Sequence, residues 1–150
     1  MRKSWRMQWI WIVVVALAFG LSACATQKQL GPMTAKDMMA DAKERGVKEI
    51  TIEQAKKDID SGKKLVVLDV REPEEFKKGH LPKAVNSPRG LLEFTVEKAI
   101  PDKNEYVIAY CKTGGRSCLA ADTLMKMGYK NAVSMAGGWE AWFKAGYPVE

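Results

Sequence analysis

The stretch that decides the fold is Tyr106–Arg116, which reads YVIAYCKTGGR. Its first five residues, Tyr106–Tyr110, are apolar and rich in strand formers, as expected of a buried strand in a parallel sheet. Beyond the loop, apolar residues recur with helical spacing over Leu119–Met127, and Ser117 stands where a helix N-cap is expected. The stretch therefore predicts a strand, a tight loop and a helix, with a cysteine as the first residue of the loop.

The loop Cys111–Arg116 has the composition of an anion-binding turn. Gly114 and Gly115 permit positive φ values, so the backbone can curl until its N–H groups converge. The start of the following helix adds partial positive charge, and Arg116 adds a full one. Such a cup stabilises a thiolate and can hold an anionic substrate, which we favour over a buried cysteine beside an ordinary turn.

Residues 1–23 predict a targeting segment rather than part of the fold. Basic residues at positions 2, 3 and 6 precede an apolar run without a charge at 9–21, which is shorter than the ~20 residues of a transmembrane helix. The next residues, Leu21–Cys24 (LSAC), resemble a bacterial lipobox, in which the cysteine carries a diacylglycerol. We therefore expect lipidation at Cys24 and a membrane anchor, the alternative being an ordinary signal peptide.

This interpretation divides the chain into a lipoprotein signal peptide at 1–23, a tether with a short helix at 24–46, and a folded domain at 47–150. It predicts a location in a bacterial cell envelope. In a host with two membranes we expect the outer membrane, facing the periplasm, because Ala25 is not the aspartate that retains lipoproteins in the inner membrane.

Removing residues 1–23 removes three cations and no anions, so the net charge falls from +6 to +3. With no basic stripe among aromatic residues, we expect no nucleic-acid partner.

Two cysteines remain besides Cys24. The chain has no CxxC pair and one histidine, so we expect no metal site, and nothing in the sequence implies a cofactor. Cys118 follows Cys111 by seven residues and has two interpretations. It is either a core residue of the helix or a resolving thiol that forms a disulfide with Cys111 under oxidative stress.

The rest of the chain alternates between strand and helix patterns. Strands are expected at 48–51, 65–70, 84–86, 106–110 and 132–135, and helices at 34–46, 53–60, 73–78, 91–99, 117–127 and 138–144. This alternation predicts an α/β fold with a mainly parallel sheet. Since the carboxyl ends of parallel strands share one rim, we expect Asp69, Arg71 and Cys111 to lie along it.

Four stretches resemble, in the right order, the motifs of the single-domain rhodanese homology family. They are Asp69–Phe76 (DVREPEEF), Gly79–Asn86 (GHLPKAVN), Cys111–Arg116 (CKTGGR) and Gly137–Pro148 (GGWEAWFKAGYP). The resemblance covers residues 47–150 and departs from the family at Lys83, where glycine is common. It implies a rhodanese-like α/β fold, with a mainly parallel central sheet and helices on both faces.

The resemblance also implies a sulfurtransferase. Cys111 would take a sulfane sulfur from a small anionic donor such as thiosulfate and become a persulfide, and cyanide, a thiol or a protein would accept the sulfur. The donor-binding residues implied are Lys112, Thr113, Gly114, Gly115 and Arg116.

Three residues are expected to support this site rather than to react. Asp69 would orient the active loop or cap backbone N–H groups, and Arg71 would pair with Glu75. His80 would hold a loop by a hydrogen bond rather than serve as an acid or base.

Three other functions stay open. A periplasmic sulfur-carrier or redox role would use Cys118, and a protein-interaction module would need no chemistry. A phosphatase is the third, but rhodanese-like phosphatases place five residues between cysteine and arginine, whereas four separate Cys111 from Arg116. The smaller loop suits a sulfur substituent better than a phosphoryl group.

Overall fold

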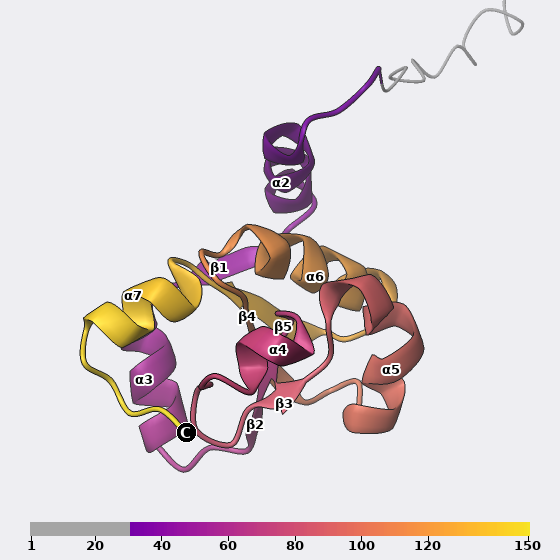
Figure 1. Cartoon of the computed structure of the whole chain (residues 1–150). Coiled ribbons are helices and arrows are strands. Elements are labelled where there is room, and N and C mark those ends of the chain that lie inside the picture. Colours follow the sequence, from indigo (N-terminus) through magenta and orange to yellow (C-terminus); the bar gives the residue numbers. More distant parts are fainter. Residues whose placement is uncertain (1–30) are drawn as a thin grey trace, which may run out of the picture. The chain divides into compact units, whose positions relative to one another are not determined.

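The computed structural model describes residues 31–150 (Figure 1). Its elements, in chain order, are α2 (Ala35–Glu44), β1 (Lys48–Ile50), α3 (Ile52–Asp60), β2 (Leu65–Asp69), α4 (Pro73–Phe76), β3 (Val85–Asn86), the 3-10 helix η1 (Arg89–Leu91), α5 (Leu92–Ala99), β4 (Tyr106–Tyr110), α6 (Gly115–Lys126), β5 (Asn131–Met135) and α7 (Gly138–Lys144). None of the helices in this part of the chain is long and apolar enough to cross a membrane. The signal peptide and lipidation at Cys24 lie outside the described residues.

The five strands form one parallel sheet in the order β1-β5-β4-β2-β3. The predicted central strand, β4, lies between β2 and β5 and pairs with β2 along its whole length, from Leu65↔Tyr106 to Asp69↔Tyr110. The edge strand β3 is short and pairs only with the last two residues of β2. The ends of β2 and β4 therefore share a rim, as the sequence predicts.

Helices cover both faces of this sheet, and two apolar clusters fill the space beneath them. Alternate residues of β4 point to opposite faces. Val107 packs in a cluster with residues of α5 and α6, whereas Ile108 packs in a cluster with Ala55 of α3 and Trp142 of α7. The predicted fold class is confirmed, and the double burial explains why the sequence of β4 is apolar throughout.

The first helix of the described residues, α2, packs on α6. Thr34 and Asp37 form a capping box at its start, and Gly46 follows its end with a φ of +107°. Ala42 of α2 is buried in a small cluster with Cys118. Arg45 donates hydrogen bonds of 3.0 and 2.9 Å to the carboxylate of Asp122. Both apolar packing and an ion pair therefore hold α2 on α6.

The prediction that Ser117 caps α6 is wrong. The helix starts at Gly115, and its N-cap is Gly114, in the left-handed conformation with a φ of +107°. Glycine adopts that conformation without steric cost, so the loop can enter the helix before Ser117 is reached. The buried Ser117 hydroxyl instead donates to the Gly114 carbonyl at 2.9 Å and contacts the Ser134 hydroxyl at 3.0 Å.

Candidate active site

Cys111 is the first residue after β4, and its side chain is buried. Its Sγ accepts a hydrogen bond of 3.2 Å from the N–H of Gly114. This contact depends on the left-handed backbone at Gly114, which turns the loop back over the sulfur. The same turn leads directly into α6, so the thiol lies beside the positive end of a long helix. Both features stabilise negative charge on sulfur.

The N-terminus of α7 holds the loop from its other side. The first N–H groups of a helix have no partners within the helix. Here the N–H of Trp139 donates to the Cys111 carbonyl at 2.8 Å, and the N–H of Glu140 donates to the Lys112 carbonyl at 3.0 Å. Gly138 permits this approach, because a Cβ at that position would stand 2.3 Å from the Cys111 carbonyl oxygen.

Arg116 is held by a carboxylate rather than left free in the loop. Its guanidinium donates two hydrogen bonds, of 2.8 and 3.0 Å, to Glu75 of α4. The hydrogen bonds raise the pKa of Arg116 and lower the pKa of Glu75. The predicted pairing of Arg71 with Glu75 is therefore wrong, since Glu75 serves Arg116.

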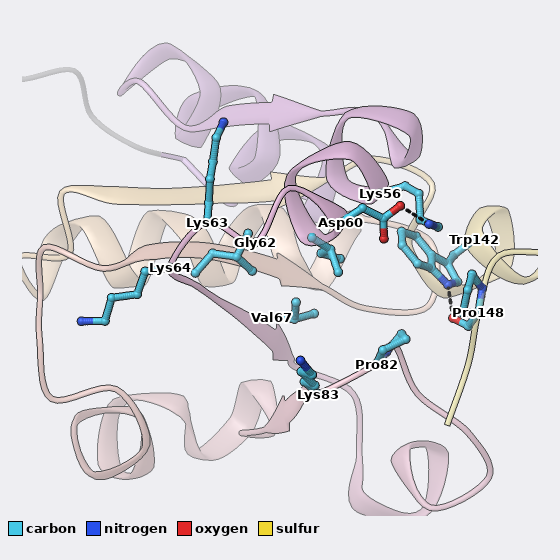
Figure 2. A pocket seen from close by; sticks show the side chains of 12 residues that line it. Lys56, Asp60, Gly62, Lys63, Lys64, Val67, Pro82, Lys83, Trp142 and Pro148 are labelled. Atoms are coloured by element: carbon cyan, nitrogen blue, oxygen red, sulfur yellow. Dashed lines mark hydrogen bonds and ion pairs between the residues drawn. The ribbon is translucent and has the colours of Figure 1, made fainter.

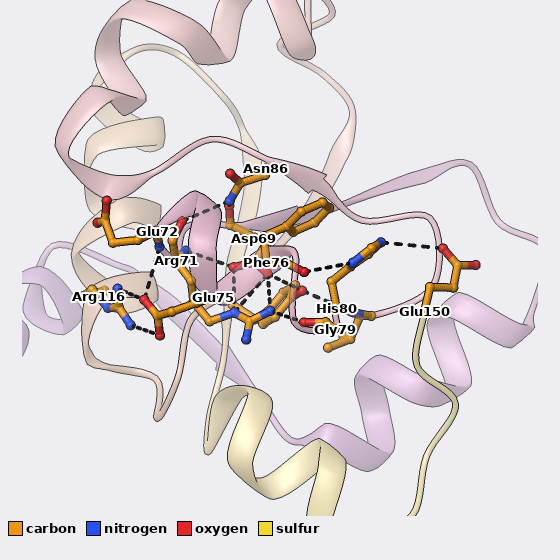
Figure 3. A network of polar contacts seen from close by, with 12 residues as sticks. Asp69, Arg71, Glu72, Glu75, Phe76, Gly79, His80, Asn86, Arg116 and Glu150 are labelled. Atoms are coloured by element: carbon orange, nitrogen blue, oxygen red, sulfur yellow. Dashed lines mark hydrogen bonds and ion pairs between the residues drawn. The ribbon is translucent and has the colours of Figure 1, made fainter.

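Arg71 instead forms a buried ion pair with Asp69, shown in Figure 3. The two groups lie 2.6 Å apart, and Asp69 also caps the Arg71 backbone N–H at 2.8 Å. Burial alone would lower the pKa of Arg71, but the contacts with Asp69 outweigh it and raise that pKa. Tyr110 completes the network by donating to Asp69 at 2.5 Å and accepting the Leu81 N–H at 3.1 Å. Arg71 also donates a hydrogen bond of 2.8 Å to the Gly79 carbonyl, which connects the carboxyl end of β2 to the loop that follows α4.

A cavity of about 190 Å³ opens beside the active loop. It is lined by Arg71, Glu75, Lys78, Gly79, Lys112 and Trp139. The Arg71 guanidinium lies 4.6 Å from the centroid of the Trp139 ring. Arg71 is paired with Asp69 and Lys112 lies 3.4 Å from Glu140, whereas Lys78 makes no ion pair within residues 31–150. The lining therefore attracts small anions mainly through its two lysines. The described residues also enclose larger cavities, of about 470 and 770 Å³, away from Cys111. The loop chemistry, rather than cavity size, identifies the site.

Residues 51–145 match the family model described as the rhodanese-like domain. The chain belongs to the rhodanese-like family. Among its relatives is a protein named "Sulfurtransferase" from Allochromatium vinosum, 30% identical over 103 residues, which are 69% of this chain and 94% of that protein. The thiosulfate sulfurtransferase PspE of Escherichia coli is 39% identical over 71 residues, covering 47% of this chain and 67% of PspE.

A solved structure extends the family likeness. The chain aligns with a Rhodopseudomonas palustris protein titled "Protein of Unknown Function RPA3614, Possible Tyrosine Phosphatase" at a TM-score of 0.74 and 30% identity, covering 81% of this chain and 98% of that one. Several curated relatives are longer than the matched region, and the chain spans 51%, 64% and 23% of the first three. The likeness to sulfurtransferases supports this class of chemistry in the rhodanese-like domain.

His80 of the rhodanese-like domain contacts its own loop. Its Nδ1 lies 3.2 Å from the Phe76 carbonyl, and its ring stacks on that of Phe76 with centroids 3.8 Å apart (Figure 3). Its backbone N–H and carbonyl both pair with Glu150, at 2.8 and 2.9 Å. His80 is not among the residues that line the cavity beside Cys111.

Cys118 is fully buried on α6, among Ala42, Val47 and Ala121. Its Sγ lies 3.9 Å from the Met39 carbonyl, and burial raises the pKa of its thiol. This is the environment that the core interpretation predicts. The role as a resolving thiol stays a prediction.

The sequence analysis missed two residues of the site, Tyr110 and Lys78. It did not assign Tyr110 to the polar network, because the tyrosine stands in an apolar run and only its hydroxyl is polar. It did not single out Lys78, which lies between two motifs. A tyrosine at the end of a buried strand, next to a predicted polar rim, was the one available signal that its hydroxyl needs a partner.

Proposed function

We propose that the protein is a sulfurtransferase that moves a sulfane sulfur from a thiosulfate-like donor to a thiophilic acceptor through a persulfide on Cys111. One observation supports this above all: the Cys111 sulfur accepts the Gly114 N–H at the entry to α6. A persulfide carries its negative charge one atom further out, so the same loop is suited to hold it. The family relationship favours the same class of reaction.

In the first step the Cys111 thiolate attacks the sulfane sulfur of thiosulfate. A sulfur–sulfur bond forms to the protein, the bond to the sulfonate sulfur breaks, and sulfite leaves with its electron pair. In the second step cyanide, a thiol or an acceptor protein attacks the terminal sulfur and restores the thiolate, with thiocyanate as the product from cyanide. Lys78 and Lys112 line the cavity through which an anionic donor would approach.

A phosphatase is the rival function, because the Rhodopseudomonas palustris structure carries that word in its title. The loop argues against it here. Four residues separate Cys111 from Arg116, and the guanidinium of Arg116 is already taken by both oxygens of Glu75. A phosphoryl group needs several donors directed at three oxygens, and a tight loop leaves some of those oxygens unpaired.

Mass spectrometry of the purified protein tests the proposal directly. Thiosulfate should add the mass of one sulfur, and cyanide should remove it and release thiocyanate. Cys111→Ser should abolish both steps, and Cys118→Ser should leave them intact. Thiocyanate production by Cys111→Ser, or aryl phosphate hydrolysis by the native protein that Cys111→Ser abolishes, would refute the assignment.

We also propose that the protein is lipidated at Cys24 and anchored in the bacterial envelope. The support is the sequence Leu21–Cys24 after a short apolar run. Labelled palmitate should mark the native protein in cells and leave Cys24→Ala unlabelled. Cys118→Ser serves as the matched cysteine control. Equal labelling of Cys24→Ala and the native protein would contradict the anchor.

A further inference from the structure

We propose that a cavity at the amino end of β2 binds a short, extended, acidic segment of a partner protein. The cavity has a volume of about 470 Å³ and is lined by the end of α3, the start of β2 and the segment Pro82–Lys83 (Figure 2). Cys111 follows the carboxyl end of the adjacent parallel strand, so the cavity and the active loop lie at opposite ends of the sheet. The inference does not rest on the proposed sulfur transfer.

An open strand edge points to an extended peptide as the occupant. β3 pairs only with Leu68 and Asp69, so within residues 31–150 the segment Leu65–Val67 has no strand neighbour on that side. Such an edge offers backbone N–H and C=O groups to an added strand. Leu65 and Val67 both line the cavity and lie on one face of β2, because they are two residues apart. A lipid chain or a free anion would leave this edge unused.

The floor of the cavity is apolar. It is formed by the side chains of Ile59, Leu65, Val67, Pro82, Trp142 and Pro148. The volume lies within the range of ~300–1,000 Å³ that is usual for binding sites. A strand that adds to the edge places every second side chain over such a floor. The occupant should therefore alternate apolar with charged residues.

The rim of the cavity is basic. Its charged lining residues are Lys56, Asp60, Lys63, Lys64 and Lys83, and Asp60 pairs with Lys56. Lys63 pairs with Asp58 and Lys64 pairs with Glu105. The side chains of these two lysines are 66% and 82% exposed, and ion pairs at such exposed positions are weak and exchange readily with a ligand. The Glu150 carboxylate accepts the backbone N–H of Lys83 at 3.1 Å, but the Lys83 ammonium makes no ion pair with any residue in 31–150. This surplus of positive charge selects an acidic segment.

The backbone at Lys83 gives an independent sign that its side chain matters. Its φ is +57°, the one positive φ of a non-glycine residue within 31–150. The Ala84 N–H donates to the Leu81 carbonyl at 3.1 Å, which closes a turn with Pro82 second and Lys83 third. Glycine is favoured at the third position of such turns, and a lysine there strains the backbone. A strained residue of this kind is a candidate for a functional role, and an exposed cation at this position suits an anionic partner. The turn leads directly into β3, which pairs with β2 only from Leu68 onward, so the segment Leu65–Val67 keeps its edge without a strand.

Fluorescence anisotropy can test the site with a labelled eight-residue peptide of alternating glutamate and valine. The native protein should bind it, and Lys83→Gly should weaken binding at least fivefold while raising the melting temperature. Lys98→Gln removes an exposed lysine from α5 outside the cavity and should bind like the native protein. Cys111→Ser should also bind normally, which separates this site from the proposed catalysis.

Methylation of alternate peptide amides tests the strand edge without changing the protein, and it should weaken binding at least tenfold. Equal binding of the methylated peptide, or of a lysine–valine peptide, would overturn the proposal. Unchanged binding by Lys83→Gly would do the same. Binding to phosphatidylglycerol vesicles without binding to the glutamate–valine peptide would replace a protein partner by a lipid surface.

Discussion

Asp69 is a completely buried carboxylate whose charge is balanced within hydrogen-bond distance. Arg71 supplies the opposite charge, and Tyr110 supplies a further hydrogen bond from the neighbouring strand. Burying a charge is costly unless it is paired and hydrogen-bonded, so each member of this network depends on the others. Truncating one member therefore costs more than the contact it removes.

Tyr110→Phe tests this dependence at the scale of one atom. The change removes a hydrogen bond to Asp69 and leaves the buried Leu81 N–H without its acceptor. We expect the free energy of unfolding to fall by about 1–3 kcal/mol, as measured by urea denaturation. Tyr106→Phe is the matched control, since its hydroxyl bonds Asp58 in a partly buried place and its loss should cost less. Equal losses in the two variants would show that burial of the network does not matter.

The active loop is held by elements on two sides. α7 provides two backbone N–H groups, and α4 provides the Glu75 carboxylate that holds Arg116. Each element is short, and each contact requires close approach to the loop. The geometry of the thiol is therefore set by helix positions as much as by the loop's own residues.

Gly138→Ala should disturb the loop through α7. The added Cβ would stand 2.3 Å from the Cys111 carbonyl oxygen and 2.8 Å from the Lys112 carbonyl, which are backbone atoms that cannot turn aside. We expect a loss of sulfur transfer of at least tenfold and a lower melting temperature. Gly146→Ala is the control, since its φ is also positive, at +70°, but nothing lies within 4 Å of its added Cβ. If both variants lose activity equally, backbone strain rather than contact with the loop is the cause.

The Glu75–Arg116 pair should give the stability a defined pH dependence. Arg116 lowers the pKa of Glu75, so the pair stabilises the folded state above the ordinary glutamate pKa of about 4.3. This contribution is lost as the pH falls through the lowered folded-state value. Because both side chains are about a third exposed, we expect Glu75→Gln to cost about 0.5–1 kcal/mol at pH 7.

This dependence can be measured by urea denaturation of the native protein and of Glu75→Gln. Both proteins are compared at pH 7 and again at pH 4 and below. The difference between the two proteins should shrink at the lower pH. Glu74→Gln, which alters a largely exposed carboxylate of the same helix, should differ little from the native protein at either pH. A difference that stays constant from pH 7 to well below pH 4 would contradict the assignment.

Sequence patterns predicted most helices and strands, because the residues that are buried in each element recur along the sequence with the period of a helix or a strand. The sequence patterns did not predict which side chains pair with each other, because that depends on the three-dimensional arrangement. Arg71 and Glu75 have the spacing of a helical pair, but α4 begins only at Pro73, so Arg71 lies outside the helix and reaches back to Asp69. The positive φ at Lys83 was not predicted, although the resemblance marks this position as one where glycine is common, and glycine is the residue that adopts such a φ without strain.

At the scale of the whole molecule, α2 protects one of the two described cysteines. Arg45 binds Asp122 on α6, and the contact keeps α2 over Cys118. Helices with little buried surface open more readily than the core. Access to Cys118 should therefore report how firmly this helix is held.

Arg45→Ala should speed the labelling of Cys118 by N-ethylmaleimide two- to fivefold. The factor corresponds to about 0.5–1 kcal/mol for a partly exposed ion pair, since ~1.4 kcal/mol is tenfold. The measurement uses a Cys24→Ala, Cys111→Ser background, so that a single thiol reacts. Lys36→Ala, on the exposed part of the same helix, should label at the native rate. Unchanged labelling in Arg45→Ala would mean that apolar contacts alone hold α2.

The strand order has a consequence for the time at which the protein can fold. β1 ends at residue 50, yet among the strands of residues 31–150 it pairs with β5 alone, at Asn131–Met135. A chain that emerges from the ribosome amino end first thus exposes β1 and the apolar β2 long before their partners exist. Sheets that depend on distant pairings form slowly. We expect the sheet to close only after nearly the whole chain has been synthesised, so that the nascent chain needs chaperone protection until then.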